Sequence, residues 1–190
     1  MVGGGNGGPL GMYHNLGDGT FVDSAHYVTG GYPDAIAAND LDHDGTLDLV
    51  TANNTCGTLS VLFNAGDGSF RDHVPLLVGS RPASVAAGDF DDDGWPDLVS
   101  TSWGYLGTTS VLTGASVLRN LGGGRFDTPL LYDAGPAPEQ LAIADFDGDG
   151  ELDIACGSLL RRTFSLDVDP CPRCGGRMCL MRPRRAASEG

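Results

Sequence analysis

Three short segments of this chain carry aspartates at the same spacing. In residues 40–48, 89–97 and 145–153, aspartate stands at positions 1, 3, 5 and 9 and glycine at position 6. Two like charges about 4 Å apart repel by roughly 4 kcal/mol at an effective dielectric near 20. Four carboxylates within one turn therefore need a cation to become compact. Because the set contains only oxygen ligands, without Cys or His, it predicts three calcium loops.

The elements that flank these loops are expected to be strands. The glycine at position 6 supplies a sharp turn, as it does in the EF-hand loop. However, the last acid stands at position 9 instead of 12, and a β-type segment follows instead of a helix. Short apolar runs enter and leave each loop, such as residues 83–87 and 97–101 around the second one. Each loop is therefore predicted to join two strands.

Internal repetition extends beyond the aspartate loops. Two further landmarks recur with the loops, at steps of 49 and then 56 residues. One is an asparagine before a glycine-rich turn that ends in phenylalanine, and the other is a proline before each loop. These landmarks are Asn15, Asn64 and Asn120, followed by Pro33, Pro82 and Pro138. The extra residues of the longer step fall within 102–115. We expect a longer surface hairpin there, with a loop that lines a binding face as the alternative.

Four short strands in each repeat of about 50 residues are typical of one propeller blade. We therefore predict an all-β chain that forms a partial β-propeller of about three blades, each of four short antiparallel strands. The repeats are placed at about 10–55, 56–110 and 111–157, within a segment that covers residues 1–157. The recurring phenylalanines are expected between adjacent blades: Phe21, Phe70, Phe126, Phe90 and Phe146.

Composition agrees with this prediction and excludes several classes of protein. With 30 Gly, 11 Pro and 19% charged residues, the 190 residues suit a soluble all-β protein rather than a helical or disordered one. The net charge of −14 argues against nucleic-acid binding by the acidic body. No apolar run approaches the ~18 residues of a membrane span. The first nine residues lack the basic and apolar regions of a signal peptide.

The order of the landmarks resembles a known repeat. Asn-x-Gly-Asp-Gly-Thr-Phe, then Pro, then Asp-Phe-Asp-x-Asp-Gly-x-x-Asp-Leu is similar to the FG-GAP repeat of integrin-α type, which is called a VCBS repeat in bacterial proteins. The resemblance covers roughly residues 10–157. It implies blades of a β-propeller, typically of seven blades, with calcium in a loop of each blade. It also implies a secreted or cell-surface parent protein that carries a signal and acts in adhesion.

The same resemblance implies a set of calcium ligands. Each loop would supply the carboxylates at positions 1, 3, 5 and 9 and the backbone carbonyl at position 7. The three sites are then Asp40, Asp42, Asp44, Thr46 and Asp48; Asp89, Asp91, Asp93, Trp95 and Asp97; and Asp145, Asp147, Asp149, Glu151 and Asp153. Known propellers close with about 4–8 blades, so the remaining blades or other chains are needed to close the ring. A protein or carbohydrate ligand is expected on the propeller face.

The tail, residues 158–190, departs from the repeat. It holds seven of the eleven arginines and three of the five cysteines, and residues 159–182 resemble the C-terminal end of an insertion-sequence transposase. We expect a non-native extension or an irregular, disordered terminus. Cys171 and Cys174 have the spacing of half a zinc site, but a lone CxxC without further ligands makes zinc the less favoured alternative. Cys56 and Cys156 are expected to be two half-buried thiols, with a disulfide between them as the alternative.

No pattern of catalytic residues is present in the sequence. Nucleophile-elbow, metalloprotease and phosphate-binding motifs are all absent, and the glycine runs lie in turns rather than before helices. We therefore predict a calcium-binding interaction module that is not an enzyme. The alternative is a fragment of a larger secreted enzyme whose catalytic domain lies outside this sequence. A third hypothesis, nucleic-acid binding through the arginines of the tail, is the least favoured.

Overall fold

The computed structural model describes residues 8–104, 114–135 and 137–157, together with the backbone of residues 179–181. These residues form strands joined by turns, and none of them forms a helix long and apolar enough to cross a membrane. The strands are β1 (Leu10–Asn15), β2 (Phe21–Tyr27), β3 (Pro33–Asn39), β4 (Asp48–Asn53), β5 (Thr58–Leu62), β6 (Val74–Leu77), β7 (Pro82–Gly88), β8 (Asp97–Ser102), β9 (Gly114–Leu118), β10 (Leu130–Tyr132), β11 (Gln140–Ala144), β12 (Asp153–Gly157) and β13 (Cys179–Met181).

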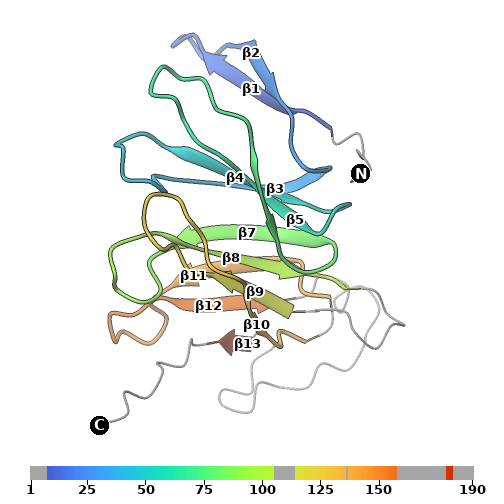
Figure 1. Ribbon diagram of the computed structural model, residues 1–190, viewed down its shortest axis with the longest axis vertical. Coiled ribbons are helices and arrows are strands. Elements are labelled where there is room, and N and C mark those ends of the chain that lie inside the picture. Colours follow the sequence, from blue (N-terminus) through green and yellow to red (C-terminus); the bar gives the residue numbers. More distant parts are fainter. Residues whose placement is uncertain (1–7, 105–113, 136, 158–178, 182–190) are drawn as a thin grey trace.

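The strands form four small antiparallel sheets that follow one another along the chain. Their orders are β1-β2, β3-β4-β5-β6, β7-β8-β9-β10 and β11-β12-β13. Figure 1 shows the sheets stacked from β1-β2 at one end to β11-β12-β13 at the other. Strands β3 and β4 contact β7, while β11 contacts β7 and β8, so the first strands of the three larger sheets lie at the stacking interfaces. The predicted all-β, partial-propeller architecture is confirmed.

The sheets are offset from the sequence repeats by about half a unit. Each complete sheet begins at a proline landmark, Pro33 or Pro82, and takes its last two strands from around the next asparagine landmark. As a result, β1 and β2 are the outer pair of a blade, and β11 and β12 are the inner pair of another. The division of the chain near residue 157 stays a prediction.

Part of the tail adds a strand that the sequence did not lead us to expect. The backbone of β13 pairs with β12, with Ala155 opposite Leu180. An uncovered edge strand leaves a row of backbone N–H and C=O groups without partners, and a third strand satisfies them. The rest of the predicted irregular tail, residues 158–178 and 182–190, lies outside the described residues.

The core consists of two apolar layers between the three main sheets. One layer includes Leu41, Val50, Leu59, Val85 and Leu98, and the other is formed by Phe90, Val99, Ala115, Val117 and Ile154. Strands β5, β8 and β9 are buried along their whole length, whereas β6 lies at an outer edge and is largely exposed. For β8 and β9 the reason is that a core layer lies on each face of their sheet. Burial of each large apolar side chain contributes about 1.5–3 kcal/mol.

The recurring phenylalanines are not all buried as predicted. Phe90 is 7% exposed and lies in the second core layer, and Phe126 packs against the first. In contrast, Phe21 is 63% exposed and Phe146 is 47% exposed. The reason is their place in the stack: Phe21 belongs to the first sheet and Phe146 to the loop of the last one. The prediction was therefore wrong for the two end sheets, where the described residues provide a neighbouring sheet on one side only.

A buried asparagine fastens two neighbouring sheets. Asn120 follows β9 and is 1% exposed. Its side-chain Nδ2 donates to the carbonyl oxygen of Leu41 in the preceding sheet at 2.8 Å and to that of Pro96 in its own sheet at 3.1 Å. Its Oδ1 accepts the amide of Gly122 at 3.1 Å and so shapes the following turn. This side chain joins a turn, a loop and a second sheet.

Replacement of this residue tests the inter-sheet bond. Asn120→Ala leaves the buried Leu41 carbonyl without its donor, so we expect a loss of about 1–3 kcal/mol in the free energy of unfolding. The matched control is Asn64→Ala, since Asn64 Oδ1 caps the same kind of turn while its Nδ2 reaches the exposed Leu47 carbonyl within its own sheet. The control is expected to lose less than about 1 kcal/mol in urea unfolding. Equal losses for the two variants would contradict this role of Asn120.

Candidate metal centres

Each predicted loop joins the first two strands of a sheet and brings three aspartates together. They are those at positions 1, 3 and 9, and in each loop carboxylate oxygens of all three lie within 4.8 Å of one another. The triplets are Asp40, Asp42 and Asp48; Asp89, Asp91 and Asp97; and Asp145, Asp147 and Asp153. The three loops join β3 to β4, β7 to β8 and β11 to β12. Each of these groups could hold a metal ion.

The backbone of the loops explains the convergence. Position 6 is in the left-handed region in all three, with φ of 88° at Gly45, 90° at Gly94 and 93° at Gly150, where glycine avoids the penalty of a Cβ. The amide of this glycine donates to Oδ2 of the position-1 aspartate, at 3.0 Å in the first loop and 2.9 Å in the other two. The turn predicted at position 6 thus folds the loop back onto its first carboxylate.

The position-9 aspartate anchors the loop to the sheet. Asp48 is fully buried, and its Oδ2 accepts the amide of Leu41 at 3.0 Å while its Oδ1 accepts that of Asn64 at 2.8 Å. Asp97 repeats both bonds with Phe90 at 3.2 Å and Asn120 at 2.7 Å. The third aspartate is 3% exposed, and its Oδ2 accepts the Phe146 amide at 3.2 Å. In the first two loops, one carboxylate therefore joins the loop to the end of the third strand.

Burial makes two of these anchors, Asp48 and Asp97, costly to ionise. Desolvation raises the pKa of Asp97 to about 6, although two backbone amides oppose the rise, and the nearby charges of Asp91 and Asp93 add to it. Desolvation also raises the pKa of Asp48, with smaller contributions from Asp42 and Asp44. A cation among these carboxylates would offset both the desolvation and the mutual repulsion.

The position-5 aspartates lie outside the triplets. Asp44 Oδ1 accepts the Thr46 amide at 2.8 Å and the Thr46 hydroxyl at 2.6 Å. Asp93 and Asp149 each accept the amide two residues ahead, from Trp95 at 2.8 Å and Glu151 at 3.0 Å. These bonds stabilise the turn and engage one oxygen of each carboxylate. The predicted ligand roles of position 5, and of the position-7 carbonyls of Thr46, Trp95 and Glu151, stay predictions.

Two buried oxygens support a metal ion in the first two loops. Oδ1 of Asp40 and Oδ1 of Asp89 are shielded from solvent and have no hydrogen-bond partner. A buried carboxylate oxygen without a partner is costly, and a cation at the triplet supplies the missing interaction. The third loop is different, since Asp145 is exposed and its Oδ1 accepts the amides of Gly148 at 2.7 Å and Asp149 at 3.2 Å. The donor sets of the first two loops fit a hard cation best.

Neighbouring side chains connect the first two loops in a way that the sequence did not indicate. The His43 and Trp95 rings are stacked, with centroids 4.1 Å apart and planes 16° from parallel. In addition, the guanidinium of Arg119 lies 3.3 Å from Oδ2 of Asp91, within the second triplet. A sequence motif made only of metal ligands cannot predict either contact, because the two residues of each pair come from separate segments of the chain.

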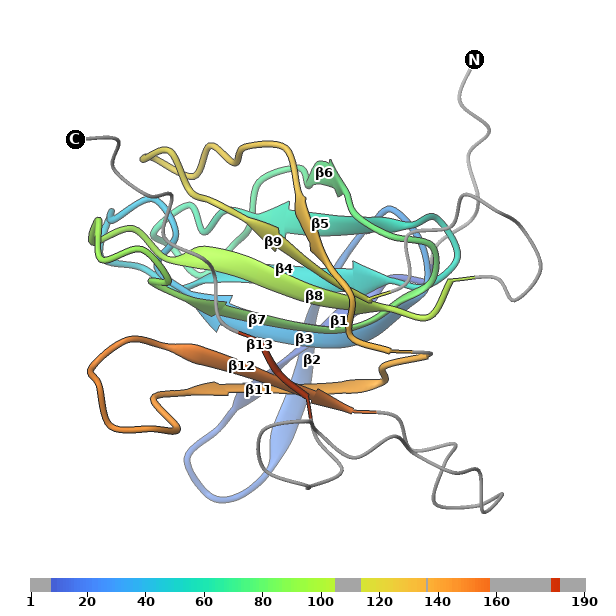
Figure 2. The same cartoon turned by 90° about the horizontal axis from the view of Figure 1, so that it is seen from below.

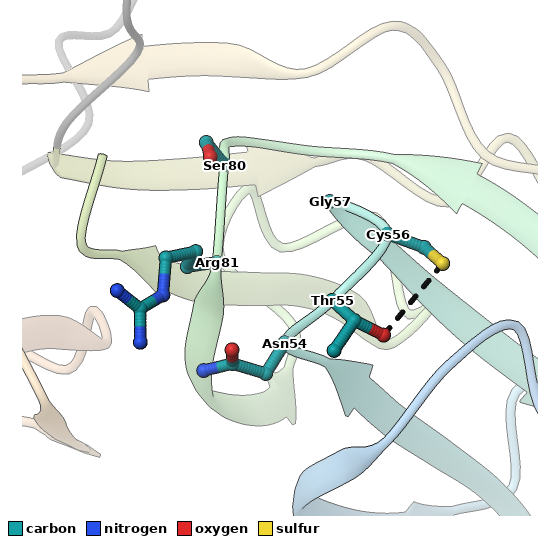
Figure 3. Close-up of a pocket in the computed structure, with 6 residues that line it drawn as sticks. All are labelled: Asn54, Thr55, Cys56, Gly57, Ser80 and Arg81. Carbon is teal, nitrogen blue, oxygen red and sulfur yellow. Dashed lines mark hydrogen bonds between the residues drawn. The ribbon is translucent and has the colours of Figure 1, made fainter. Parts of the chain in front are cut away.

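A separate pocket lies at the opposite end of the strands. Its volume is about 570 Å³, and it is lined by Asn54, Thr55, Cys56, Gly57, Ser80 and Arg81. In Figure 3 the Arg81 and Asn54 side chains point to one side, while the Thr55 hydroxyl and Cys56 thiol face each other on the other side, 3.7 Å apart. The Arg81 guanidinium also lies 5.2 Å from the centre of the Trp103 ring. The lining groups do not converge on one point, which is unlike a catalytic site.

The cysteines of the described residues contribute to no metal group. Cys56 is exposed in the turn between β4 and β5, whereas Cys156 is buried in β12 of another sheet, so the two are not joined to each other. They differ from the predicted pair of half-buried thiols, because β12 is covered and the β4–β5 turn is not. Cys171 and Cys174, the alternative zinc ligands, lie outside the described residues.

Comparison with known proteins adds a family match. The model of a family described as "FG-GAP-like repeat" matches residues 1–51 and 40–100, which together cover more than half of the chain. No curated protein matches the sequence. The two matched segments contain the first two aspartate loops.

Replacement of a position-9 aspartate tests its structural role. Asp97→Ala leaves the buried amides of Phe90 and Asn120 without acceptors, and each such group costs about 1–3 kcal/mol. We expect a large loss in the free energy of unfolding, measured by urea titration with a chelator present so that metal binding plays no part. The control is Asp93→Ala, at an exposed position, with an expected change of less than about 1 kcal/mol. Similar effects of the two substitutions would contradict the anchor role.

Proposed function

The chain belongs to the FG-GAP-like repeat family, and on this premise we propose that it is a calcium-binding β-propeller module with a structural and interaction role and no catalytic one. Repeats of this family are typically non-catalytic modules. The observation that carries the calcium proposal is the pair of buried, unpartnered oxygens of Asp40 and Asp89 beside two further carboxylates in each loop. Such an arrangement has an unbalanced negative charge, most of which a bound divalent ion would offset.

The donor chemistry favours calcium over other ions. All three groups consist of carboxylates, without the nitrogen or sulfur ligands that transition metals prefer. Calcium accepts six to eight oxygens in irregular geometry, whereas magnesium demands a near-ideal octahedron and keeps several waters. The loops provide carboxylates from one short, asymmetric turn and leave other positions to backbone carbonyls and water. This arrangement suits the more tolerant ion.

The ion would act on the fold through the anchor aspartates. Asp48 and Asp97 belong to the triplets and also hold the amides of Asn64 and Asn120, which start the turns after β5 and β9. An ion bound by the triplet would keep these carboxylates ionised and in place. The loop, the second strand and the third strand of the sheet would then be fixed together. The sheet would present a rigid surface to a ligand, for which a protein or a carbohydrate is proposed.

A location outside the cell or at its surface is part of the same proposal. Extracellular calcium modules commonly bind the ion with dissociation constants of about 10⁻⁴–10⁻³ M. Partly exposed loops that lack a complete protein cage suit this range. In such a medium the sites would be occupied, and the module would be held in its stable form.

Calcium is expected to stabilise the fold. The melting temperature should rise with millimolar calcium and fall when a chelator is added, because an ion that binds only the folded state stabilises it, by about 0.4–1.4 kcal/mol per site at a one- to tenfold excess over Kd. Scanning calorimetry measures this shift, and magnesium chloride at the same concentration is the control for ionic strength. Identical melting curves in calcium, magnesium and chelator would count against the proposal.

A single substitution separates ion binding from turn formation. Asp89→Asn keeps an oxygen for the Gly94 amide but replaces the unpartnered Oδ1 with an amide group, which cannot bind a cation. We expect the calcium affinity of this loop to fall by at least about tenfold in calorimetric titration. The control is Asp67→Asn, which removes the same charge from a hairpin turn and keeps an acceptor for the Ser69 amide. A calcium isotherm changed equally by both variants would show a general charge effect instead of a site.

A further inference from the structure

An arginine lies beside the aspartates of the second loop. Arg119, the residue directly before Asn120, donates from Nη1 to Oδ2 of Asp91 at 3.3 Å. Asp91 is the position-3 aspartate of the second triplet. Because a guanidinium is positively charged at any physiological pH, this group of carboxylates has a cation of its own before a metal ion binds.

The anchor aspartate of the loop places this arginine. Oδ1 of Asp97 accepts the amide of Asn120 at 2.7 Å and so fixes the chain beside the loop where β9 ends. Figures 1 and 2 both show the β7–β8 loop (green) and the connection between β9 and β10 (yellow to gold) at the same end of their sheet. The contact between Arg119 and Asp91 therefore follows from the hydrogen bond that holds the loop to its sheet.

The equivalent position of the preceding sheet carries a phenylalanine. Phe63 directly precedes Asn64, whose amide donates to Asp48 of the first loop at 2.8 Å. The Phe63 side chain packs against the first core layer and carries no charge. In the part of the chain that the structure describes, no basic side chain forms an ion pair with an aspartate of the first triplet. The two loops thus differ in their local charge, although their ligand patterns are the same.

The first loop has an arginine nearby, but at a different position. Arg71 lies across the hairpin from Phe63, and its amide donates to the Phe63 carbonyl at 2.8 Å. Its charge acts on position 5: bonds from the hydroxyl and amide of Thr46 lower the pKa of Asp44, and Arg71 adds a smaller effect. This aspartate helps to form the turn and lies outside the triplet.

A second partner for the Arg119 guanidinium lies across its own hairpin. The Asp127 amide donates to the Arg119 carbonyl at 2.9 Å, which places the two residues opposite each other. Oδ2 of Asp127 is 3.9 Å from Nη2 of Arg119, within range of an ion pair but too far for a hydrogen bond. A small movement of the guanidinium away from Asp91 would therefore give it a hydrogen bond to Asp127.

We propose that Arg119 competes with calcium at the second loop and changes partner when the ion binds. This inference rests on the proposed calcium binding and concerns how strongly the second loop binds the ion. In the metal-free chain, Arg119 pairs with Asp91. A divalent ion at the triplet repels the guanidinium, so Arg119 leaves Asp91 and pairs with Asp127. The first loop binds its ion without this competition.

The expected effect is modest because the ion pair is partly exposed. The side chains of Arg119 and Asp91 are 50% and 32% exposed, and pairs of this kind contribute little free energy in water. Loss of such a pair corresponds to a change of about two- to fivefold in a dissociation constant. The pair leaves Oδ1 of Asp89 without a partner, so the second loop still gains from a bound ion.

An amide NMR titration of the full chain with calcium measures the two loops separately. The position-6 glycines, Gly45 and Gly94, each donate to the position-1 aspartate of their own loop, so their signals report on different sites. Both signals should shift as calcium is added, each with its own midpoint. No calcium-dependent shift of either signal would contradict the proposed calcium binding, and this inference would fall with it.

Arg119→Gln removes the competing charge and keeps a long polar side chain. We expect the Gly94 midpoint to fall by about two- to fivefold while the Gly45 midpoint stays the same. The control is Arg125→Gln, which removes the same charge from the same hairpin, where the guanidinium donates to backbone carbonyl oxygens. If both glycines titrate but Arg119→Gln leaves the Gly94 midpoint unchanged, or Arg125→Gln lowers it equally, the competition is wrong and the proposed function still stands.

Asp127→Asn tests the change of partner. Without the charge of Asp127, Arg119 has less reason to leave Asp91, so the Gly94 midpoint should rise. The same substitution in the Arg119→Gln chain should have a much smaller effect, because no guanidinium remains to be moved. An equal rise in the two backgrounds would reveal a general effect of charge and would overturn the exchange of partners.

Discussion

Each of the first two aspartate loops depends on one buried carboxylate that accepts two backbone amides. Asp97 takes the amide of Phe90 from the loop and that of Asn120 from beyond the third strand, and Asp48 takes the equivalent pair. Because these amides are buried, the loss of their acceptor would cost more than an ordinary surface bond. The carboxylate is therefore a structural residue first. It is also one of the three aspartates that converge in the loop, because its two amide bonds hold it beside the other two.

This double role would couple the binding of an ion to the stability of the sheet. Burial raises the pKa of Asp97 to about 6, so its charge is held at a cost in the absence of a cation. Asp89 adds a buried oxygen without a partner to the same group. A cation would satisfy both and leave the amide bonds of Asp97 intact. The acidity of the chain is thus concentrated where it can be neutralised.

Stacking imposes the other constraint on the molecule. Inner strands such as β8 and β9 are buried on both faces, so a sheet of this kind is complete only between two neighbours. The exposed Ile36 and Phe146 mark the two places where the described residues end the stack. The residues at the equivalent positions of the neighbouring repeat are buried against another sheet. The exposed end faces therefore have the shape and composition of a sheet-on-sheet interface, rather than that of a general hydrophobic patch.

The sequence by itself determined the repeat, the strand-loop-strand units and the positions of the three acidic loops, because aspartate spacing and the glycine at position 6 act within one turn. It could not decide which acids converge, since Asp44 bonds to its own turn while Asp48 is positioned by Leu41 and by Asn64, sixteen residues away. Nor could it show that Asn120 reaches Leu41, or that His43 stacks on Trp95. These contacts join separate sheets and loops. Only the stacking of the sheets brings their partners together, and for the same reason Phe90 is buried while Phe146 is exposed.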